Sequence, residues 1–114
     1  MNVVPGDLFW ISPDETNQIA SDHTHPHVVI QYDVSNAVTV CALTSNLKRV
    51  KEPGNVLLEE DEANLSRQSV VVVSQAFTVE KSQLGEHIGT LTENRVQQVL
   101  AGMRLLHYMT QHHE

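Results

Sequence analysis

Apolar residues occur along this chain in short blocks that polar residues, glycine and proline separate. The blocks are rich in valine and other β-branched residues, which favour strands over helices. Two of them, at residues 25–33 and 37–46, are separated by only three residues, about the length that joins antiparallel neighbours. We therefore predict a β-hairpin over residues 25–46 and expect the rest of the chain to be organised around it.

The pairing within this hairpin brings polar residues together at its open end. If the turn lies near residues 34–35, each residue of the first strand pairs with the residue of the second strand whose number brings the sum of the two numbers to about 70. His25 then falls opposite Thr44 or Ser45. The polar groups expected to gather there belong to His25, Thr44, Ser45, Asn46, Lys48 and Arg49. This end of the hairpin is a candidate site, although polar residues at strand ends are also ordinary, because loops leave them in water.

Four other segments have the pattern of strands. The longest, at residues 69–79, contains four consecutive valines, so we expect a central strand buried on both faces. The other three are residues 6–11, 54–59 and 86–91. We also expect residues 28–30, 38–40 and 70–73 to share one core, because together they supply the β-branched area that a small sheet needs.

Polar segments connect these strands. Residues 14–24 are expected to form either a flap over the candidate site or a plain solvated connection. Residues 48–53 should be a basic loop, and residues 80–84 a short turn. The acidic run at residues 59–65 is long enough for one helical turn, because carboxylates favour a helix N-terminus.

The C-terminal segment predicts an amphipathic helix from Thr92, a good N-cap residue, to about Met109. The apolar residues at helical spacing are Val96, Val99, Leu100, Met103 and Leu106. This stripe should cover one end of the sheet or contact a partner chain. The expected fold class is mainly β, a small and strongly bent antiparallel sheet with a C-terminal α-helix, in a single domain over residues 1–114.

Composition narrows the functions open to such a domain. Its formal net charge of -7 argues against an extended basic surface for nucleic acid and leaves only local contacts. No segment has the roughly 18 consecutive apolar residues of a membrane span, so we expect a soluble, cytoplasmic protein. Cys41, the only cysteine, should be a small buried hydrophobe without a disulfide.

The histidines raise the question of a metal. His23, His25 and His27 alternate, as ligands on one face of a strand do. No second group of histidine, cysteine or aspartate completes a clear set of ligands, and Pro26 interrupts the strand. We therefore expect no bound metal and no cofactor.

The polar residues at the hairpin end suit the cleavage of RNA through its own 2′-hydroxyl. This reaction needs a base, an acid and hydrogen-bond donors around the phosphate, and the protein need not supply a nucleophile. An imidazole can transfer protons near neutral pH, and hydroxyl and amide groups can donate hydrogen bonds. Lys48 or Arg49 can attract the phosphate.

From Gly6 to about Leu106 the chain resembles the MazF/PemK toxins of toxin–antitoxin systems. The motifs that carry the resemblance are, in order, Gly-Asp-Leu-Phe-Trp, His-Pro-His-Val-Val-Ile-Gln-Tyr-Asp, Val-Cys-Ala-Leu-Thr-Ser-Asn-Leu-Lys-Arg, Asn-Val-Leu-Leu, Ser-Val-Val-Val-Val-Ser-Gln-Ala-Phe-Thr-Val-Glu-Lys-Ser-Gln-Leu and Gly-Thr-Leu-Thr. The resemblance implies an SH3-like barrel with a C-terminal helix that forms a homodimer. It also implies metal-independent, sequence-specific cleavage of single-stranded RNA and inhibition by a small antitoxin protein.

The family's functional positions are only partly matched. Its threonine or serine at the end of the third strand corresponds to Thr44, and its glutamine in the long strand corresponds to Gln75. Its arginine before proline is His25 here, an acidic residue is Ser74, and a second arginine is Phe77. We expect catalytic roles for His25, Thr44 and Ser45, and substrate-binding roles for Asn46, Lys48, Arg49, Gln75 and His27.

The exchange of arginine for His25 leaves two hypotheses. In the first, the imidazole takes over acid–base work, and the protein is an endoribonuclease toxin. In the second, the barrel has lost or changed this activity and acts by binding a protein target or antitoxin without cleaving anything.

Overall fold

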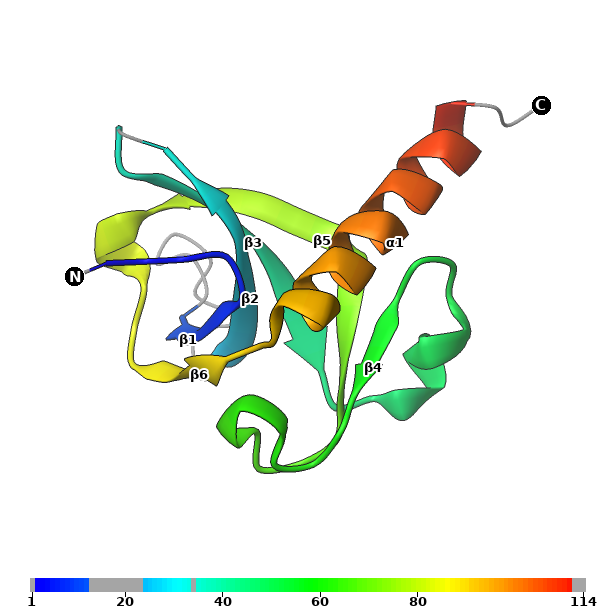
Figure 1. Cartoon of the computed structure of the whole chain (residues 1–114), viewed down its shortest axis with the longest axis horizontal. Coiled ribbons are helices and arrows are strands. Elements are labelled where there is room, and N and C mark those ends of the chain that lie inside the picture. Colours follow the sequence, from blue (N-terminus) through cyan, green and yellow to red (C-terminus); the bar gives the residue numbers. More distant parts are fainter. Residues whose placement is uncertain (1, 13–23, 34, 112–114) are drawn as a thin grey trace.

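The β2–β3 hairpin lies near the middle of a single six-stranded sheet in the computed structural model, which describes residues 2–12, 24–33 and 35–111 (Figure 1). The strands are β1 (Asp7–Ile11), β2 (His25–Tyr32), β3 (Ala37–Thr44), β4 (Val56–Leu58), β5 (Ser69–Glu80) and β6 (His87–Thr90). The helices are α1 (Glu93–Gln111) and the 3-10 helices η2 (Leu47–Lys51), η3 (Glu62–Asn64) and η4 (Lys81–Gln83).

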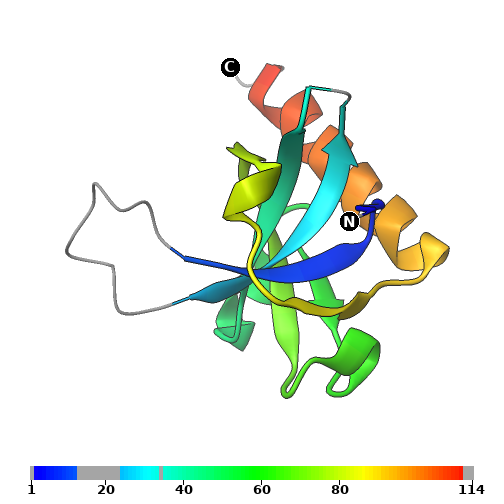
Figure 2. The ribbon, with the colours of Figure 1, turned by 90° about the vertical axis from the view of Figure 1, so that its left-hand side faces the viewer.

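The strands lie in the order β4-β5-β3-β2-β1-β6, and every pair is antiparallel. The sheet curls on itself, and α1 lies along one of its faces (Figure 2). The predicted fold class, a small barrel-like antiparallel sheet with a C-terminal helix, is confirmed. The segment predicted as a flap or connection, residues 14–24, lies outside the described residues except for Thr24. No helix in the described part of the chain is long and apolar enough to cross a membrane.

The hairpin has the predicted register. His27 pairs with Ala42, and an irregularity beyond Val29 shifts the later pairs by one residue. Continuing the first register by two residues places His25 opposite Thr44, as expected from the sequence. The turn is held by the Asp33 carboxylate, whose Oδ1 accepts hydrogen bonds from the backbone nitrogens of residues 35 and 37 at 2.9 and 3.2 Å.

The expectation of one shared core is wrong, because the apolar residues form two separate clusters. One, the helix-side core, includes Val28, Ile30, Cys41, Leu43, Val71, Val73, Val96 and Val99. The other, the second core, includes Val3, Phe9, Ile11, Val29, Val38, Val40 and Val79. Successive side chains of a strand point to opposite faces, so the neighbours Val28 and Val29 enter different cores.

The long strand β5 is buried on both faces over only part of its length. Residues 69–73 are buried, but residues 74–78 are exposed, which corrects the prediction for the whole run. The pairing with β3 changes register between these parts: Ala42 pairs with Val72, whereas Cys41 pairs with Ala76. Residues 73–75 therefore form a bulge, and bulges commonly redirect side chains next to functional sites.

The helix α1 begins as predicted and ends two residues later than expected. Thr92 caps it, since its Oγ1 accepts a hydrogen bond from the Arg95 nitrogen at 3.3 Å. Its apolar stripe packs on the helix-side core, so it covers the sheet, and the C-terminal half of the helix projects beyond the sheet (Figure 1). The predicted acidic turn is η3, and its Glu62 pairs with Arg95 at 2.6 Å.

The helix approaches the loop before β4 at a contact between two glycines. A Cβ atom added at Gly102 would overlap the carbonyl oxygen of Gly54, and Gly54 itself has a φ of +83°. A side chain at either position would force two backbone segments apart.

Gly102→Ala should therefore lower the free energy of unfolding by about 1–3 kcal/mol, because the added methyl group overpacks this contact. At an exposed helical position, a change from glycine to alanine should instead raise the free energy of unfolding by about 1 kcal/mol. The sign of the measured change therefore shows whether Gly102 makes this close contact. Urea unfolding measures the change. The exposed neighbour offers a control, Ala101→Gly, which should lose only about 1 kcal/mol of helix propensity. A stabilised Gly102→Ala protein would contradict the contact.

Candidate active site

Two pockets open at the end of the β2–β3 hairpin, and His25, Leu43 and Thr44 line both of them. We call the first, of about 500 Å³, the loop pocket, because the loop before β5 forms one wall. The second, of about 460 Å³, is the bulge pocket, because the β5 bulge forms its wall. The ridge between them, formed by His25 and Thr44, is the candidate active site.

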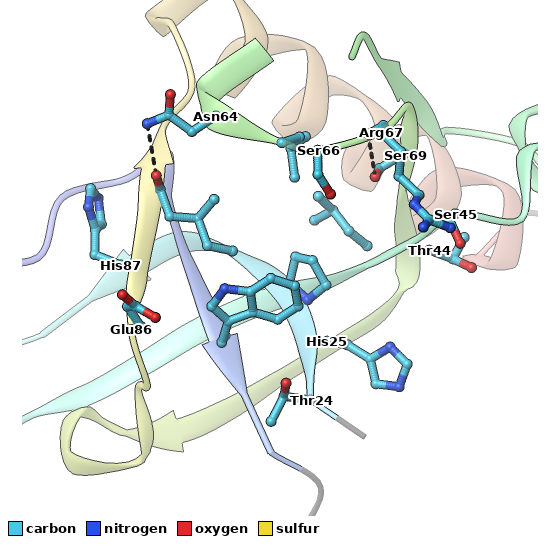
Figure 3. Close-up of a pocket in the computed structure, with 15 residues that line it drawn as sticks. Thr24, His25, Thr44, Ser45, Asn64, Ser66, Arg67, Ser69, Glu86 and His87 are labelled. Atoms are coloured by element: carbon cyan, nitrogen blue, oxygen red, sulfur yellow. Dashed lines mark hydrogen bonds between the residues drawn. The ribbon is translucent and has the colours of Figure 1, made fainter. Parts of the chain in front are cut away.

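The loop pocket has a polar wall on one side. Its members are His25, Thr44, Ser45, Ser66, Arg67 and Ser69. Figure 3 shows the Arg67 side chain running from the loop toward Thr44 and Ser45. Glu86 and His87 lie on the opposite side of the pocket, and His87 donates a hydrogen bond from Nε2 to Asp7 at 3.1 Å.

The bulge pocket combines polar and aromatic groups. It is lined by His25, His27, Thr44, Arg49, Gln75 and Phe77, together with small apolar residues. The Phe77 side chain is 43% exposed and meets His27 edge to face, with ring centroids 5.4 Å apart. An exposed aromatic ring beside an amide suits a nucleobase, which stacks on one and can hydrogen-bond to the other.

The backbone after β3 orients the hydroxyl of Thr44. The Asn46 nitrogen donates a hydrogen bond to Thr44 Oγ1 at 3.1 Å, which leaves the hydroxyl hydrogen for another acceptor. Asn46 Oδ1 in turn accepts from the Lys48 nitrogen at 3.2 Å and caps η2. The prediction of a basic loop at residues 48–53 is therefore wrong for residues 48–51, which belong to the 3-10 helix η2. Neither Asn46 nor Lys48 lines either of these two pockets, but Asn46 meets the ridge through its backbone hydrogen bond to Thr44.

Arg49 lines the bulge pocket, but its charge is already paired. Its guanidinium makes a bidentate contact with Glu52, with Nε to Oε2 at 2.9 Å and Nη2 to Oε1 at 3.0 Å. The hydrogen bond raises the pKa of Arg49 and lowers that of Glu52. Asn55 joins this pair to the bulge, because its Oδ1 accepts from the Val73 nitrogen at 3.0 Å. Arg49 thus belongs to a polar network that links η2 to β5 through Asn55.

His27 is a buried imidazole, only 7% exposed, next to the ridge. Its Nδ1 donates a hydrogen bond to the backbone oxygen of His25 at 2.8 Å, so Nε2 is the acceptor in the neutral ring. Burial lowers the pKa of His27, and the charge of His25 acts in the same direction, while the hydrogen bond opposes them. The ring is therefore neutral at pH 7.

The pockets also contain residues that the sequence pattern did not single out, chiefly Arg67 and Ser69. Arg67 and Ser69 reach the site because the start of β5 pairs with the end of β3, where Thr44 lies opposite Val70. That long-range pairing is the signal needed to find them. Cys41 is buried as expected, and burial raises the pKa of its thiol to about 11, which makes it a poor nucleophile. His23 lies outside the described residues.

The buried His27 should make stability depend on pH. The pKa of His27 is lower in the folded protein than its ordinary value of about 6.5 in the unfolded chain. As the pH falls below about 6.5, the unfolded chain binds a proton on this histidine and the folded protein does not. The free energy of unfolding therefore falls with the pH below this value and is not reduced by His27 above it. Replacing His27 should reduce the free energy of unfolding that is lost at low pH. We expect His27→Gln to lose less unfolding free energy between about pH 7.5 and 5 than the parent. The exposed His107→Gln is the control for removal of one histidine, and equal pH dependence of all three proteins would contradict the effect.

The comparisons with known proteins agree with this architecture. The family described as PemK-like, MazF-like toxin of type II toxin-antitoxin system matches residues 4–107. Endoribonuclease MazF2 of Mycobacterium bovis and endoribonuclease MazF6 of Mycobacterium tuberculosis are each 31% identical over 111 residues, which cover 91% of this chain and 96% of the relative. Endoribonuclease MazF of Staphylococcus saprophyticus is 31% identical over 98 residues, which cover 82% of this chain and 82% of the relative.

Solved structures show the same fold. An endoribonuclease in complex with its cognate antitoxin from Mycobacterial species has a TM-score of 0.70 at 15% identity, covering 90% of this chain and 91% of that one. The Mycobacterium tuberculosis toxin MazF-mt6 has a TM-score of 0.65 at 19% identity, covering 85% and 91%. From the family match and the relatives' identity over nearly the whole length, this chain belongs to the PemK-like, MazF-like toxins of type II toxin-antitoxin systems.

Proposed function

We propose that this toxin is a metal-independent endoribonuclease that cleaves single-stranded RNA at specific sequences on the ridge between its two pockets. The observation that carries the proposal is that His25 and Thr44 line both pockets. A phosphate on the ridge would have space on each side for the nucleotides that it joins. The curated relatives at 31% identity are endoribonucleases, which supports the same activity here.

The residues of the ridge suit the reaction. A base removes the proton of the 2′-hydroxyl, the 2′-oxygen bonds to phosphorus, and the bond from phosphorus to the 5′-oxygen breaks as an acid protonates that oxygen. We assign the acid or base to His25, because an imidazole exchanges protons near neutral pH. Thr44 and Ser45 donate hydrogen bonds to the phosphate oxygens as charge develops on them.

The bulge pocket supports sequence preference. An unstacked base can lie on the exposed ring of Phe77, while the Gln75 amide can hydrogen-bond to its edge. Neutral His27 offers one acceptor beside them. Because the whole chain carries a formal net charge of -7, such contacts must be local rather than spread over a basic surface.

We further propose that residues 1–114 act as one cytoplasmic domain, which forms a homodimer and is inhibited by a small antitoxin. One structural relative is an endoribonuclease in complex with its cognate antitoxin, which supports the second partner. Exposed apolar residues on the projecting half of α1, Leu105, Tyr108 and Met109, support an interface. Sedimentation should give a dimer at micromolar concentration, and a monomer there would contradict this assembly.

The second candidate function is binding without cleavage. The observation that favours it is His25 itself, since a histidine stands on the ridge where the family resemblance implies a permanently charged arginine. In that case the protein would dock on a protein target or antitoxin and leave RNA intact.

Digestion of a long single-stranded RNA in EDTA from about pH 5 to 9 separates the two functions. The parent should give discrete fragments at a rate that depends on pH. His25→Ala should lower the rate about 10²-fold or more, since it loses the proton-transfer group. Thr44→Ala should cost less, because it removes one neutral donor. His25→Arg should flatten the pH profile, because arginine keeps its charge throughout.

Two results would contradict the assignment. Equal cleavage by the parent and His25→Ala would remove His25 from the mechanism. An inactive parent together with an active His25→Arg would identify a toxin fold whose catalytic group has been lost and would favour the binding function.

A further inference from the structure

We propose that Arg67 supplies the permanent positive charge that holds the scissile phosphate of an RNA against Thr44 and Ser45. This inference rests on the proposed function and deepens it, because it names a phosphate-binding residue on a different segment of the chain. The charge that the family resemblance places before Pro26 would here come from the loop before β5.

The position of the Arg67 side chain carries the proposal. It lines the loop pocket with His25, Thr44 and Ser45, and it extends toward the two hydroxyl residues (Figure 3). Among the residues that line this pocket, it is the only lysine or arginine. A guanidinium is a planar fork of donors that matches the oxygens of a phosphate, and it stays charged at every pH relevant to the enzyme.

Among the described residues, Arg67 differs from Arg49 and Arg95 in having no carboxylate partner. In the part of the chain that the structure describes, Arg49 is paired with Glu52 and Arg95 with Glu62, but no ion pair involves Arg67. The backbone oxygen of Arg67 accepts a hydrogen bond from Ser69 Oγ at 3.2 Å, and this bond leaves the guanidinium uninvolved. Glu86 lines the same pocket from the opposite side (Figure 3).

The backbone on both sides of Arg67 is anchored, which places its exposed side chain at the edge of the loop pocket. Before it, Leu65 is buried in the helix-side core. After it, Gln68 donates a hydrogen bond from Nε2 to Glu59 Oε1 at 3.0 Å, and buried Ser69 begins β5. Anchored flanks reduce the conformational entropy lost when a ligand binds.

The role is electrostatic and adds no bond change to the reaction proposed above. Phosphorus still gains the 2′-oxygen and loses the 5′-oxygen, and the protons still pass through the acid and base. The guanidinium remains protonated and stabilises the negative charge on the non-bridging oxygens. Arg67 therefore contributes charge, and His25 contributes proton transfer.

Binding tests the contact without requiring cleavage. The probe is a fluorescent single-stranded oligonucleotide of mixed sequence with 2′-O-methyl sugars, which lacks the attacking hydroxyl. For Arg67→Ala, the slope of log affinity against log salt concentration should fall in magnitude by about 0.7, the value for one lost phosphate contact with a single strand. Arg67→Lys should keep the slope but bind more weakly. Arg104→Ala, an exposed arginine on α1 outside both pockets, should behave as the parent does.

Cleavage of a long single-stranded RNA in EDTA gives the second readout. Arg67→Ala should lower kcat/KM by about 10²-fold, with partial recovery in Arg67→Lys. The pH midpoint should stay where the parent has it, because Arg67 moves no proton, whereas His25→Arg should abolish that midpoint. Thermal melting shows that the variants remain folded.

The outcomes separate this inference from the proposed function. An Arg67→Ala protein that matches Arg104→Ala in salt slope and in cleavage overturns the role of Arg67. A parent that cleaves nothing overturns the proposed function, while a reduced salt slope in Arg67→Ala would still establish the phosphate contact.

Discussion

The pairing of β3 with β5 is the constraint on which the site depends. It brings the end of β3, with Thr44, beside the start of β5, and its change of register creates the bulge at residues 73–75. A bulge leaves backbone groups without partners, and a buried unsatisfied N–H costs about 1–3 kcal/mol. Asn55 removes this cost for Val73, and the contact of Glu52 with Asn55 and Arg49 holds that amide in place. The polar network beside the bulge pocket is thus part of how the sheet is built.

This use of Arg49 explains why a basic residue near a site need not be a ligand for phosphate. Arg49 makes a bidentate contact with Glu52, and such a pair satisfies both the charge and the geometry of the guanidinium. The same holds for Arg95, which ties α1 to η3. Of the two basic residues near the hairpin end, Arg49 lines the bulge pocket and Lys48 lines neither pocket, so their predicted role in substrate binding stays a prediction.

The features predictable from sequence were those that depend on neighbours along the chain. The hairpin register follows from a short turn, and the start of α1 follows from Thr92 and the apolar spacing after it. The two cores were missed because a run such as Val70–Val73 does not say which face each side chain takes. Arg67 was missed as a site residue because its position depends on the β3–β5 pairing, which joins segments about 30 residues apart and has no local signal.

The presence of His25 on the ridge can be understood if charge and proton transfer are separate tasks. An arginine can hold a phosphate but cannot exchange a proton near neutral pH, whereas an imidazole can exchange one but is charged only part of the time. A site with histidine alone would bind phosphate weakly on a chain of net charge -7. A second cation in the same pocket removes this difficulty, and the loop before β5 contains one. On this argument the substitution at residue 25 is compatible with catalysis only because another segment of the fold can supply the missing charge.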